Sequence, residues 1–224
     1  MKIKNKLAVF LTALFVSFSS SAIAFEGFSI GATYSSLDFS TSGYETRVGN
    51  AITNVAEKNS TTKNGSGDVG SIFAEYTFSQ GSTIGIESIS GSTEIGKGSR
   101  TESSATITAS ASVSDPLTFY VEPTWMANDS FGIYLKGGAT RVTLTPKEVA
   151  DASNHVTSTY SSQDVWGIMT GIGAKAYYNN FFVKAEYVET EFETYSFTST
   201  AGDKNTINAD VDTEETRISI GYNF

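Results

Sequence analysis

The amino-acid sequence predicts an all-β fold, a single antiparallel up-and-down transmembrane β-barrel of eight strands. Three observations support this fold class. The N-terminal segment has the pattern of a secretion signal, eight later segments alternate apolar and polar residues, and the connections between those segments alternate between short and long.

Residues 1–24 have the features of a cleaved secretory signal peptide. Lys2, Lys4 and Lys6 precede an apolar run over residues 7–18, and the segment ends in an A-x-A pattern at Ala24. This order of features is typical of a signal peptide. The alternative, a retained membrane anchor, is disfavoured because the apolar run is short for a bilayer-spanning helix. We therefore expect cleavage after Ala24 and one barrel domain over residues 25–224.

Charge and cysteine content narrow the class of protein further. The chain has 15 Lys and Arg against 24 Asp and Glu, a net charge of −9, and loss of three lysines with the signal peptide lowers it to −12. This balance disfavours nucleic acid as a partner, because cations are what bind the phosphate backbone. The sequence contains no Cys, which excludes disulfides and thiolate metal ligands.

The connections between the alternating segments come in two lengths. Short ones, at residues 79–82, 127–130 and 179–180, are rich in turn-forming residues. Long polar stretches near residues 40–68, 91–112, 143–163 and 191–212 are predicted as loops. This alternation is the layout of an outer-membrane barrel, with short turns in the periplasm and long loops at the cell surface. The expected strands are Gly27–Phe39, Val69–Phe78, Thr83–Ser90, Val113–Trp125, Phe131–Val142, Asp164–Tyr178, Phe181–Thr190 and Thr213–Phe224.

Alternation within the strands separates an apolar face from a polar one. In the first strand Phe28, Ile30 and Tyr34 share one face, and small polar residues share the other. A soluble, lipocalin-like barrel would turn the apolar face inward. Gly138 and Gly221 lie on the charged face, where a narrow lumen needs small side chains, so we expect the apolar face to contact lipid. Aromatic residues beside the short turns form the expected interfacial girdle: Phe28, Phe78, Trp125, Phe131, Tyr178, Phe181 and Phe224.

Charged residues on the inward face form the candidate site. They are Glu75, Glu87, Glu122, Lys136, Lys175, Lys184, Glu186 and Arg217. A charge in a narrow lumen must be paired or hydrated, because isolated burial is costly. We interpret the set as a structural network that plugs the lumen, since side chains can fill an eight-stranded barrel. A gated narrow pore is the alternative. Glu186 and Arg217, on adjacent strands, are predicted partners.

Three stretches resemble the small OmpA/OmpX-type outer-membrane barrels. Residues 27–34 are similar to the first strand of such proteins, and residues 171–178 to an inner strand leading into a periplasmic turn. The chain ends in Tyr222-Asn223-Phe224, with Ser219 where the family usually carries Gly. The resemblance implies an outer-membrane location among lipid and lipopolysaccharide. It also implies that periplasmic chaperones and the barrel-assembly machinery are partners during biogenesis, with Tyr222 and Phe224 as the assembly signal.

Residues with catalytic or metal-binding chemistry form no strong pattern. His155, the only histidine, lies near Asp151 and Ser153 in the third long stretch, and we expect an exposed loop residue rather than part of a catalytic triad. The acidic fourth stretch, between Glu189 and Glu215, is expected to be solvated, with weak divalent-cation binding beside lipopolysaccharide as the alternative. We predict no catalytic residue, metal site or cofactor.

The predicted function is therefore structural and surface-interacting, with four polar loops displayed around a plugged lumen. Two alternatives stay open. One is a narrow, porin-like channel for small solutes. The other is a membrane-embedded hydrolase or acyltransferase that uses His155 as its base.

Overall fold

The computed structural model describes residues 25–47, 57–89, 91–102, 105–150, 160–198 and 206–224. The predicted signal peptide lies outside these ranges. No helix in them is long and apolar enough to cross a membrane. The strands are β1 (Gly27–Arg47), β2 (Glu57–Thr77), β3 (Thr83–Ile89), β4 (Ser92–Glu102), β5 (Ala105–Glu122), β6 (Thr124–Asn128), β7 (Phe131–Ala150), β8 (Gln163–Tyr178), β9 (Phe181–Phe192), β10 (Tyr195–Thr198) and β11 (Thr206–Asn223).

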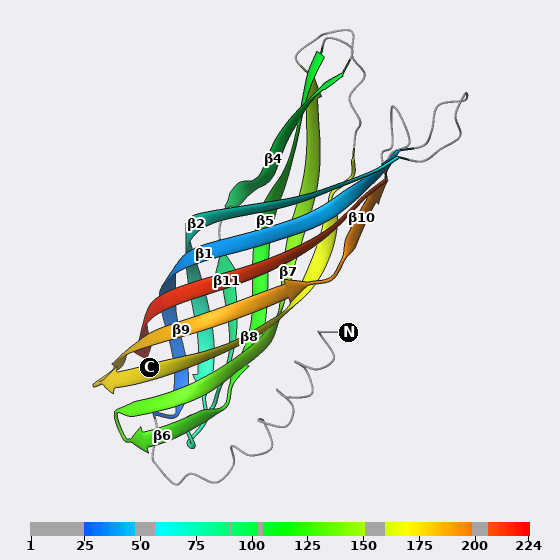
Figure 1. The fold of residues 1–224 in the computed structure, drawn as a ribbon. Helices are drawn as coiled ribbons and strands as arrows, with labels where there is room; N and C mark the ends of the chain where they lie inside the picture. The colour runs from blue at the N-terminus through cyan, green and yellow to red at the C-terminus, as the bar shows by residue number, and fades with distance from the viewer. Residues whose placement is uncertain (1–24, 48–56, 90, 103–104, 151–159, 199–205) are drawn as a thin grey trace.

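These strands close into one antiparallel eight-stranded barrel, in which three of the eight barrel strands are each made of two consecutive segments (Figure 1). In chain order the barrel strands are β1, β2, β3 with β4, β5 with β6, β7, β8, β9 with β10, and β11, which pairs back onto β1. The break between β5 and β6 falls at Pro123, whose missing N–H cannot donate to the sheet. The predicted fold class is confirmed.

The barrel has a short-turn end and a long-loop end. At the short-turn end the Gly81 N–H donates to the Phe78 carbonyl at 2.7 Å, and Asn179 takes the positive φ of 52° that suits a tight turn. At the long-loop end the prediction of four long loops was wrong in extent. β1 and β2 remain paired as far as Arg47 and Glu57, because their Ser- and Thr-rich segments satisfy each other's backbone groups.

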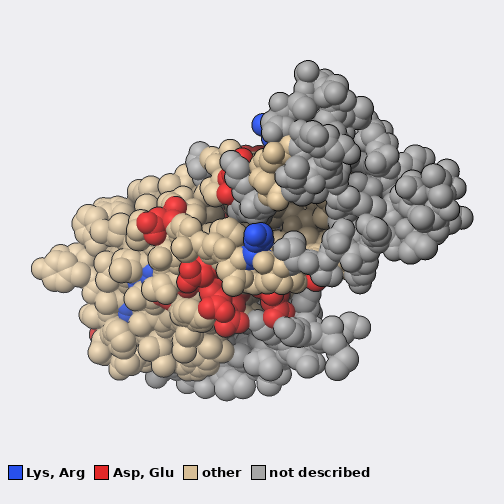
Figure 2. All heavy atoms as spheres, turned by 45° about the horizontal axis from the view of Figure 1, so that its top comes forward, with Lys and Arg blue, Asp and Glu red and all other residues tan. Residues whose placement is uncertain are grey.

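The outer surface of the short-turn half is an apolar band. On β1 the outward residues run from Phe28 to Tyr34, and Ile30 is 53% exposed. Such a continuous surface is unfavourable in water and matches the lipid-facing band of a transmembrane barrel. Beyond Tyr34 the outward residues become Ser36 and Asp38. Figure 2 likewise shows Asp and Glu side chains gathered on the outer surface beyond a region with few charges.

At the same level the residues that face inward change from polar to apolar. Below the boundary β1 turns Thr33 and Ser35 inward, and above it β1 turns Leu37 and Phe39 inward. The inward residues of β11 change in the same way, from Arg217 and Glu215 below the boundary to Val211 and Ala209 above it. The short-turn half is therefore apolar outside and polar inside, as in a membrane barrel. The long-loop half is polar outside and apolar inside, as in a soluble barrel.

Above the membrane band the wall opens along one seam. β2 pairs with β3 only as far as Ser71 and Ile89, and no pairing of β2 with β4 occurs within the described ranges. Beyond that point β4, β5 and β7 rise together while β1, β2 and β11 lean away (Figure 1). A bulge at Asp115, with a φ of 53°, interrupts the pairing of β5 near this level. We call the unpaired boundary between β2 and β4 the seam.

On the far side of the barrel from the seam the wall stays connected. The Glu193 N–H donates to the Trp166 carbonyl at 2.9 Å, which links the end of β9 to β8. Inside this wall a cluster of buried apolar side chains packs together: Val142, Leu144, Val165 and Phe197. The long-loop half therefore has a hydrophobic core on one side and an opening on the other.

Candidate functional site

Glu122 lies at the centre of the lower lumen. It ends β5 directly before Pro123, and its side chain is fully buried. Three lysines from other strands surround its carboxylate: Lys184 at 2.9 Å, Lys136 at 3.3 Å and Lys175 at 3.8 Å. Because an isolated buried charge costs several kcal/mol, these lysines are what makes a carboxylate tolerable at this depth.

Two of these lysines extend the network toward neighbouring strands. Lys184 Nζ lies 2.6 Å from a carboxylate oxygen of Glu75 on β2, and the Tyr120 hydroxyl donates to the same oxygen at 2.8 Å. Lys175 Nζ donates to the Gly81 carbonyl and the Thr83 hydroxyl, both at 3.0 Å. Lys175 thus ties the network to the first short turn.

Lys136 connects this lower group to an upper one. Its Nζ lies 2.8 Å from Glu186 on β9. Arg217 on β11 is the register partner of Glu186, with its Nε 3.7 Å from the nearer carboxylate oxygen. The Arg217 guanidinium also donates to Glu87 on β3, and the Ser71 hydroxyl donates to the same carboxylate. Glu87 is therefore a closer partner of Arg217 than Glu186 is.

The contacts join all the predicted lumen charges into one connected network of ion pairs, to which the structure adds Glu215. The Glu215 carboxylate lies 3.9 Å from Arg217 Nε. We call the set the charge ladder: Glu75, Glu87, Glu122, Lys136, Lys175, Lys184, Glu186, Glu215 and Arg217. Sequence reasoning assigned Glu215 to the acidic fourth loop, although it shares the inward parity of Arg217. With Glu215 included, the acids of the ladder outnumber its bases by one.

Aromatic side chains fill the space around the charge ladder, and glycines make room for them. A Cβ atom on Gly85 would lie 2.3 Å from the Tyr120 ring, and one on Gly173 would lie 2.4 Å from the Tyr134 ring. Phe73 lies over Gly31 and Phe182 over Gly221 in the same way. Lys136 Nζ sits 4.1 Å from the centre of the Tyr120 ring, within range of a cation–π contact. The sequence signal for this arrangement was an inward aromatic residue facing an inward glycine.

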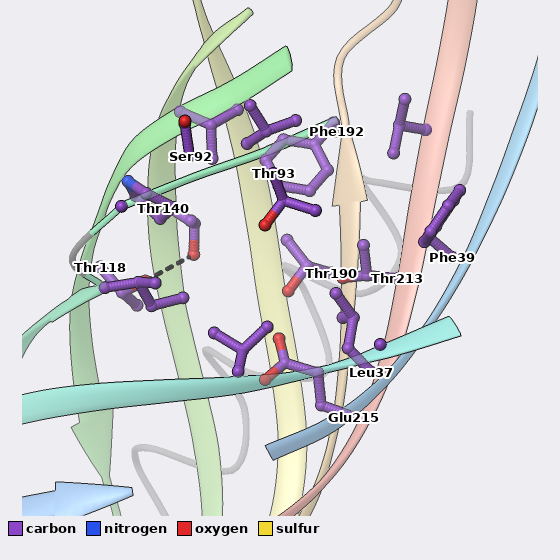
Figure 3. A pocket seen from close by; sticks show the side chains of 18 of the residues that line it. Leu37, Phe39, Ser92, Thr93, Thr118, Thr140, Thr190, Phe192, Thr213 and Glu215 are labelled. Atoms are coloured by element: carbon purple, nitrogen blue, oxygen red, sulfur yellow. Dashed lines mark hydrogen bonds between the residues drawn. The ribbon is translucent and has the colours of Figure 1, made fainter. Parts of the chain in front are cut away.

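A cavity of about 420 Å³ lies directly above the charge ladder, in the long-loop half. Its walls are mostly apolar, and Figure 3 shows Leu37, Phe39 and Phe192 among them. Its polar residues include the threonines Thr118, Thr140, Thr190 and Thr213, and the ladder members Glu87, Glu215 and Arg217. Tyr195 also lines it, and burial together with the nearby Asp210 raises the pKa of its hydroxyl to about 12, so it is neutral at physiological pH. No sequence pattern had indicated this cavity.

The predicted aromatic girdle residues lie at the outer surface of the short-turn end. Phe28, Phe78, Phe131, Tyr178, Phe181 and Phe224 are exposed and Trp125 is half-buried. Tyr76 and Tyr222 join some of them into edge-to-face series, because the Phe28 and Tyr76 rings are 5.0 Å apart and the Tyr222 and Phe224 rings 5.3 Å apart. The arrangement covers the last strand's end with aromatic surface.

The remaining sequence candidates lie apart from the lumen. His155 falls outside the described residues, and so do its neighbours Asp151 and Ser153. Within the described ranges no group of three or more His, Asp or Glu side chains is arranged to hold a metal ion. Thr194 and Asp210, at the start of the acidic fourth stretch and on its return, share a hydrogen bond.

This chain is similar to known proteins in both sequence and fold. The outer membrane protein beta-barrel domain matches residues 7–224. Among solved structures, OprG from Pseudomonas aeruginosa is 18% identical, with 91% of this chain and 97% of OprG covered and a TM-score of 0.52. Outer membrane protease OmpT from Escherichia coli is 8% identical (93% and 100% covered, TM-score 0.46), and Neisserial surface protein A is 12% identical (87% and 99% covered, TM-score 0.41).

The likeness to OprG supports the fold alone, because the identity is low. No curated protein sequence matches the chain. The domain match covers nearly the whole chain and agrees with the apolar band, the eight barrel strands and the aromatic strand ends described above. The protein therefore resides in the outer membrane and belongs to the outer membrane protein beta-barrel domain family.

Proposed function

We propose that this protein is a closed barrel whose role lies in what its long-loop end presents at the cell surface, and that it is neither a through-channel nor an enzyme. The observation that carries the proposal is the charge ladder. Its members reach from the first short turn, at Lys175, to the floor of the cavity, at Glu215. Side chains paired across the lumen leave it filled over the height of the membrane band.

The narrow channel is the second candidate, and the packing of the lumen disfavours it. Glu122, Lys136 and Lys184 are each no more than 3% exposed. An ion that passed would have to displace pairs at 2.6–3.3 Å and move rings that sit against glycines. An eight-stranded barrel is just wide enough to be filled by side chains, which agrees with a plug.

An enzymatic role gains no support from the lumen carboxylates. Glu75, Glu122 and Glu186 each have a lysine within 3.0 Å, as expected of structural ion pairs rather than of an acid–base pair open to substrate. We accordingly assign the ladder a structural role.

The surface role follows from how far the strands continue beyond the membrane band. The β1–β2 hairpin stays paired up to Arg47 and Glu57, well above Tyr34. Outward Asp38, Asp68 and Glu214 lie just above the band, where they would meet lipopolysaccharide headgroups, alone or through divalent cations. We further propose that Tyr222 and Phe224 are read by the barrel-assembly machinery, after periplasmic chaperones have delivered the chain.

Conductance across a planar bilayer tests the closed barrel. The unmodified protein should insert without producing steady current, whereas a Glu122→Ala/Lys184→Ala double variant should conduct, because two buried and paired side chains that fill the lower lumen are shortened. Heat-dependent mobility on a gel confirms that each protein is folded. Large, stable conductance of the unmodified protein would replace the plug with the channel.

A further inference from the structure

The cavity above the charge ladder differs from the rest of the lumen in its chemistry. Leu37, Val69, Val113, Leu144 and Met169 line it from separate strands, so apolar side chains surround the space on several sides. Enclosed apolar spaces of about 300–1,000 Å³ with a few polar groups are the usual form of small-molecule sites. The cavity, at about 420 Å³, falls within that range.

The cavity reaches the outside through the seam. Its lining includes Gly67 and Gly70 on the β2 side and Gly91 and Ser92 on the β4 side, which are the two unpaired edges. A Cβ atom added to Gly67, Gly70 or Gly91 would meet nothing within 4 Å. The rim therefore includes small residues with open space around them, beside Asp68 and Glu94.

The seam begins at the upper edge of the membrane band. Gly70 pairs with Tyr34, which is outward, 57% exposed and the last aromatic residue before β1 becomes polar outside. Tyr187 on β9 lies at a similar level, and its hydroxyl donates to Glu214 at 2.9 Å. Tyrosines with an apolar ring and a hydrogen-bonded hydroxyl are typical of the membrane interface. A molecule dissolved in the outer leaflet can thus reach the seam without crossing the ladder.

The floor of the cavity selects against anions. Arg217, the one cation that lines it in the described part of the chain, already faces Glu87, Glu186 and Glu215. Of the charged floor residues Glu215 is the most open, with a side chain 17% exposed against 4% for Arg217. A carboxylate ligand would therefore meet excess negative charge in a poorly hydrated space.

We propose that this cavity is a binding site for an uncharged, mainly apolar small molecule that enters through the seam between β2 and β4. The inference is independent of the surface role, because it uses only the cavity, the seam and the charges of the floor. The exit route alone rests on the proposed closed barrel: with the charge ladder filling the lumen below, a bound molecule leaves by the seam or by the long-loop end rather than into the periplasm.

Methyl NMR in lipid nanodiscs tests the proposal with naphthalene as the probe. Methyl groups of Leu144, Val142 and Met169 report on the cavity, and those of Ile133 and Ile172 report on simple partitioning into lipid, because they face outward. The cavity methyls should shift saturably with naphthalene, while the outward methyls should shift only in proportion to concentration. 1-Naphthoate, of similar size but anionic, should leave the cavity methyls unchanged.

One substitution inside the cavity and one on the outer face provide a matched pair of variants. Gly67 of β2 points inward beside Val69 and has room for a side chain, whereas Ser36 of β1 is exposed on the outer face and does not line the cavity. Gly67→Phe should abolish the saturable shift by filling the cavity, and Ser36→Phe should leave it intact. Shifts that do not saturate in the unmodified protein would overturn the proposal, whether or not the variants fold. So would equal binding of naphthoate, or unchanged binding by a folded Gly67→Phe variant.

The same spectra identify the route of entry. Nuclear Overhauser effects from lipid acyl chains to the Leu144 and Met169 methyls, lost when naphthalene is added, would show that the site draws apolar molecules from the membrane. Saturable naphthalene shifts without such effects would show that the ligand comes from the aqueous side. Both results support the site and differ only in the source of its ligand.

Discussion

The two halves of this barrel are built from the same strands and yet solve opposite solvation problems. In the short-turn half the outer face contacts lipid, and the interior holds acidic and basic side chains that pair with one another. In the long-loop half the outer face carries Asp38 and Glu214, and the interior holds Leu37 and Leu144 around a cavity. The difference shows that strand parity fixes which positions face inward. The medium outside the barrel at each height determines whether those positions carry polar or apolar residues.

Removing the central carboxylate should break the lower half most severely. Glu122→Gln leaves Lys136, Lys175 and Lys184 facing one another without their shared counter-charge. We expect a loss of about 3–5 kcal/mol in the free energy of unfolding, because an unpaired buried charge carries its full desolvation cost. Urea unfolding in lipid vesicles measures it. The control is Glu214→Gln at the outer surface, and a similar loss in both variants would contradict the comparison.

A charge placed on the outer face should distinguish the two halves next. Ile220→Arg, in the middle of the outward series of β11, should cost about 2–4 kcal/mol, as an arginine near the bilayer midplane does. Ser40→Arg, outward on β1 above the band, should change stability by less than about 0.5 kcal/mol, as is usual for exposed sites. Both are measured by unfolding in the same vesicles. Equal costs would mean that the polar change beyond Tyr34 does not mark the edge of the bilayer.

Double-mutant cycles should sharpen the description of the upper ladder. Arg217 is hydrogen-bonded to Glu87 and lies 3.7 Å from Glu186, so coupling to Glu87 should be the larger of the two. We expect coupling energies within about 0.5–3 kcal/mol, measured with Arg217→Gln combined with Glu87→Gln or Glu186→Gln. Additive effects in both cycles would show that the ladder is not a connected network.

The smallest effect is expected from two valine truncations, which compare side-chain packing below and above the cavity floor. Val188 is fully buried against Tyr120 and Met169, whereas Val211 borders the cavity. Val188→Ala should cost about 1.5–2 kcal/mol for its two lost methyl groups, and Val211→Ala less, because that side chain already lacks neighbours on one side. Thermal or urea unfolding of both variants provides the test. A larger cost at Val211 would indicate that the cavity is filled by packed protein.

The sequence predicted the membrane half well because its pattern has a single meaning there. Period-two alternation, with Phe28 to Tyr34 on one face and glycines and charges on the other, fits only a narrow lumen surrounded by lipid. The inward parity of Glu122, Lys184 and Arg217 follows directly from it. The partners do not, because the height at which inward residues meet depends on strand stagger, which paired Arg217 with Glu87 across the lumen.

The long-loop half was harder to predict because its pattern reverses. Residues such as Ser36, Asp38 and Ser40 look like a loop when the expected outward face is apolar, although Leu37 and Phe39 between them keep the alternation. Reading the alternation with either sign would have extended β1 and β11 beyond the band. The cavity had no such signal, since its lining comes from residues scattered over the whole chain.

The charge ladder also bears on the order in which the protein folds and unfolds. Its cross-lumen contacts join residues far apart in the chain, since Lys184 and Glu75 are separated by 109 positions and Arg217 and Glu87 by 130. Such pairs form only after the entropy of closing a long loop has been lost, so they belong to the last stage of folding, when the first and last strands meet. Contacts absent from the folding transition state mainly slow unfolding. The buried charges should therefore lengthen the lifetime of the inserted barrel more than they speed its assembly.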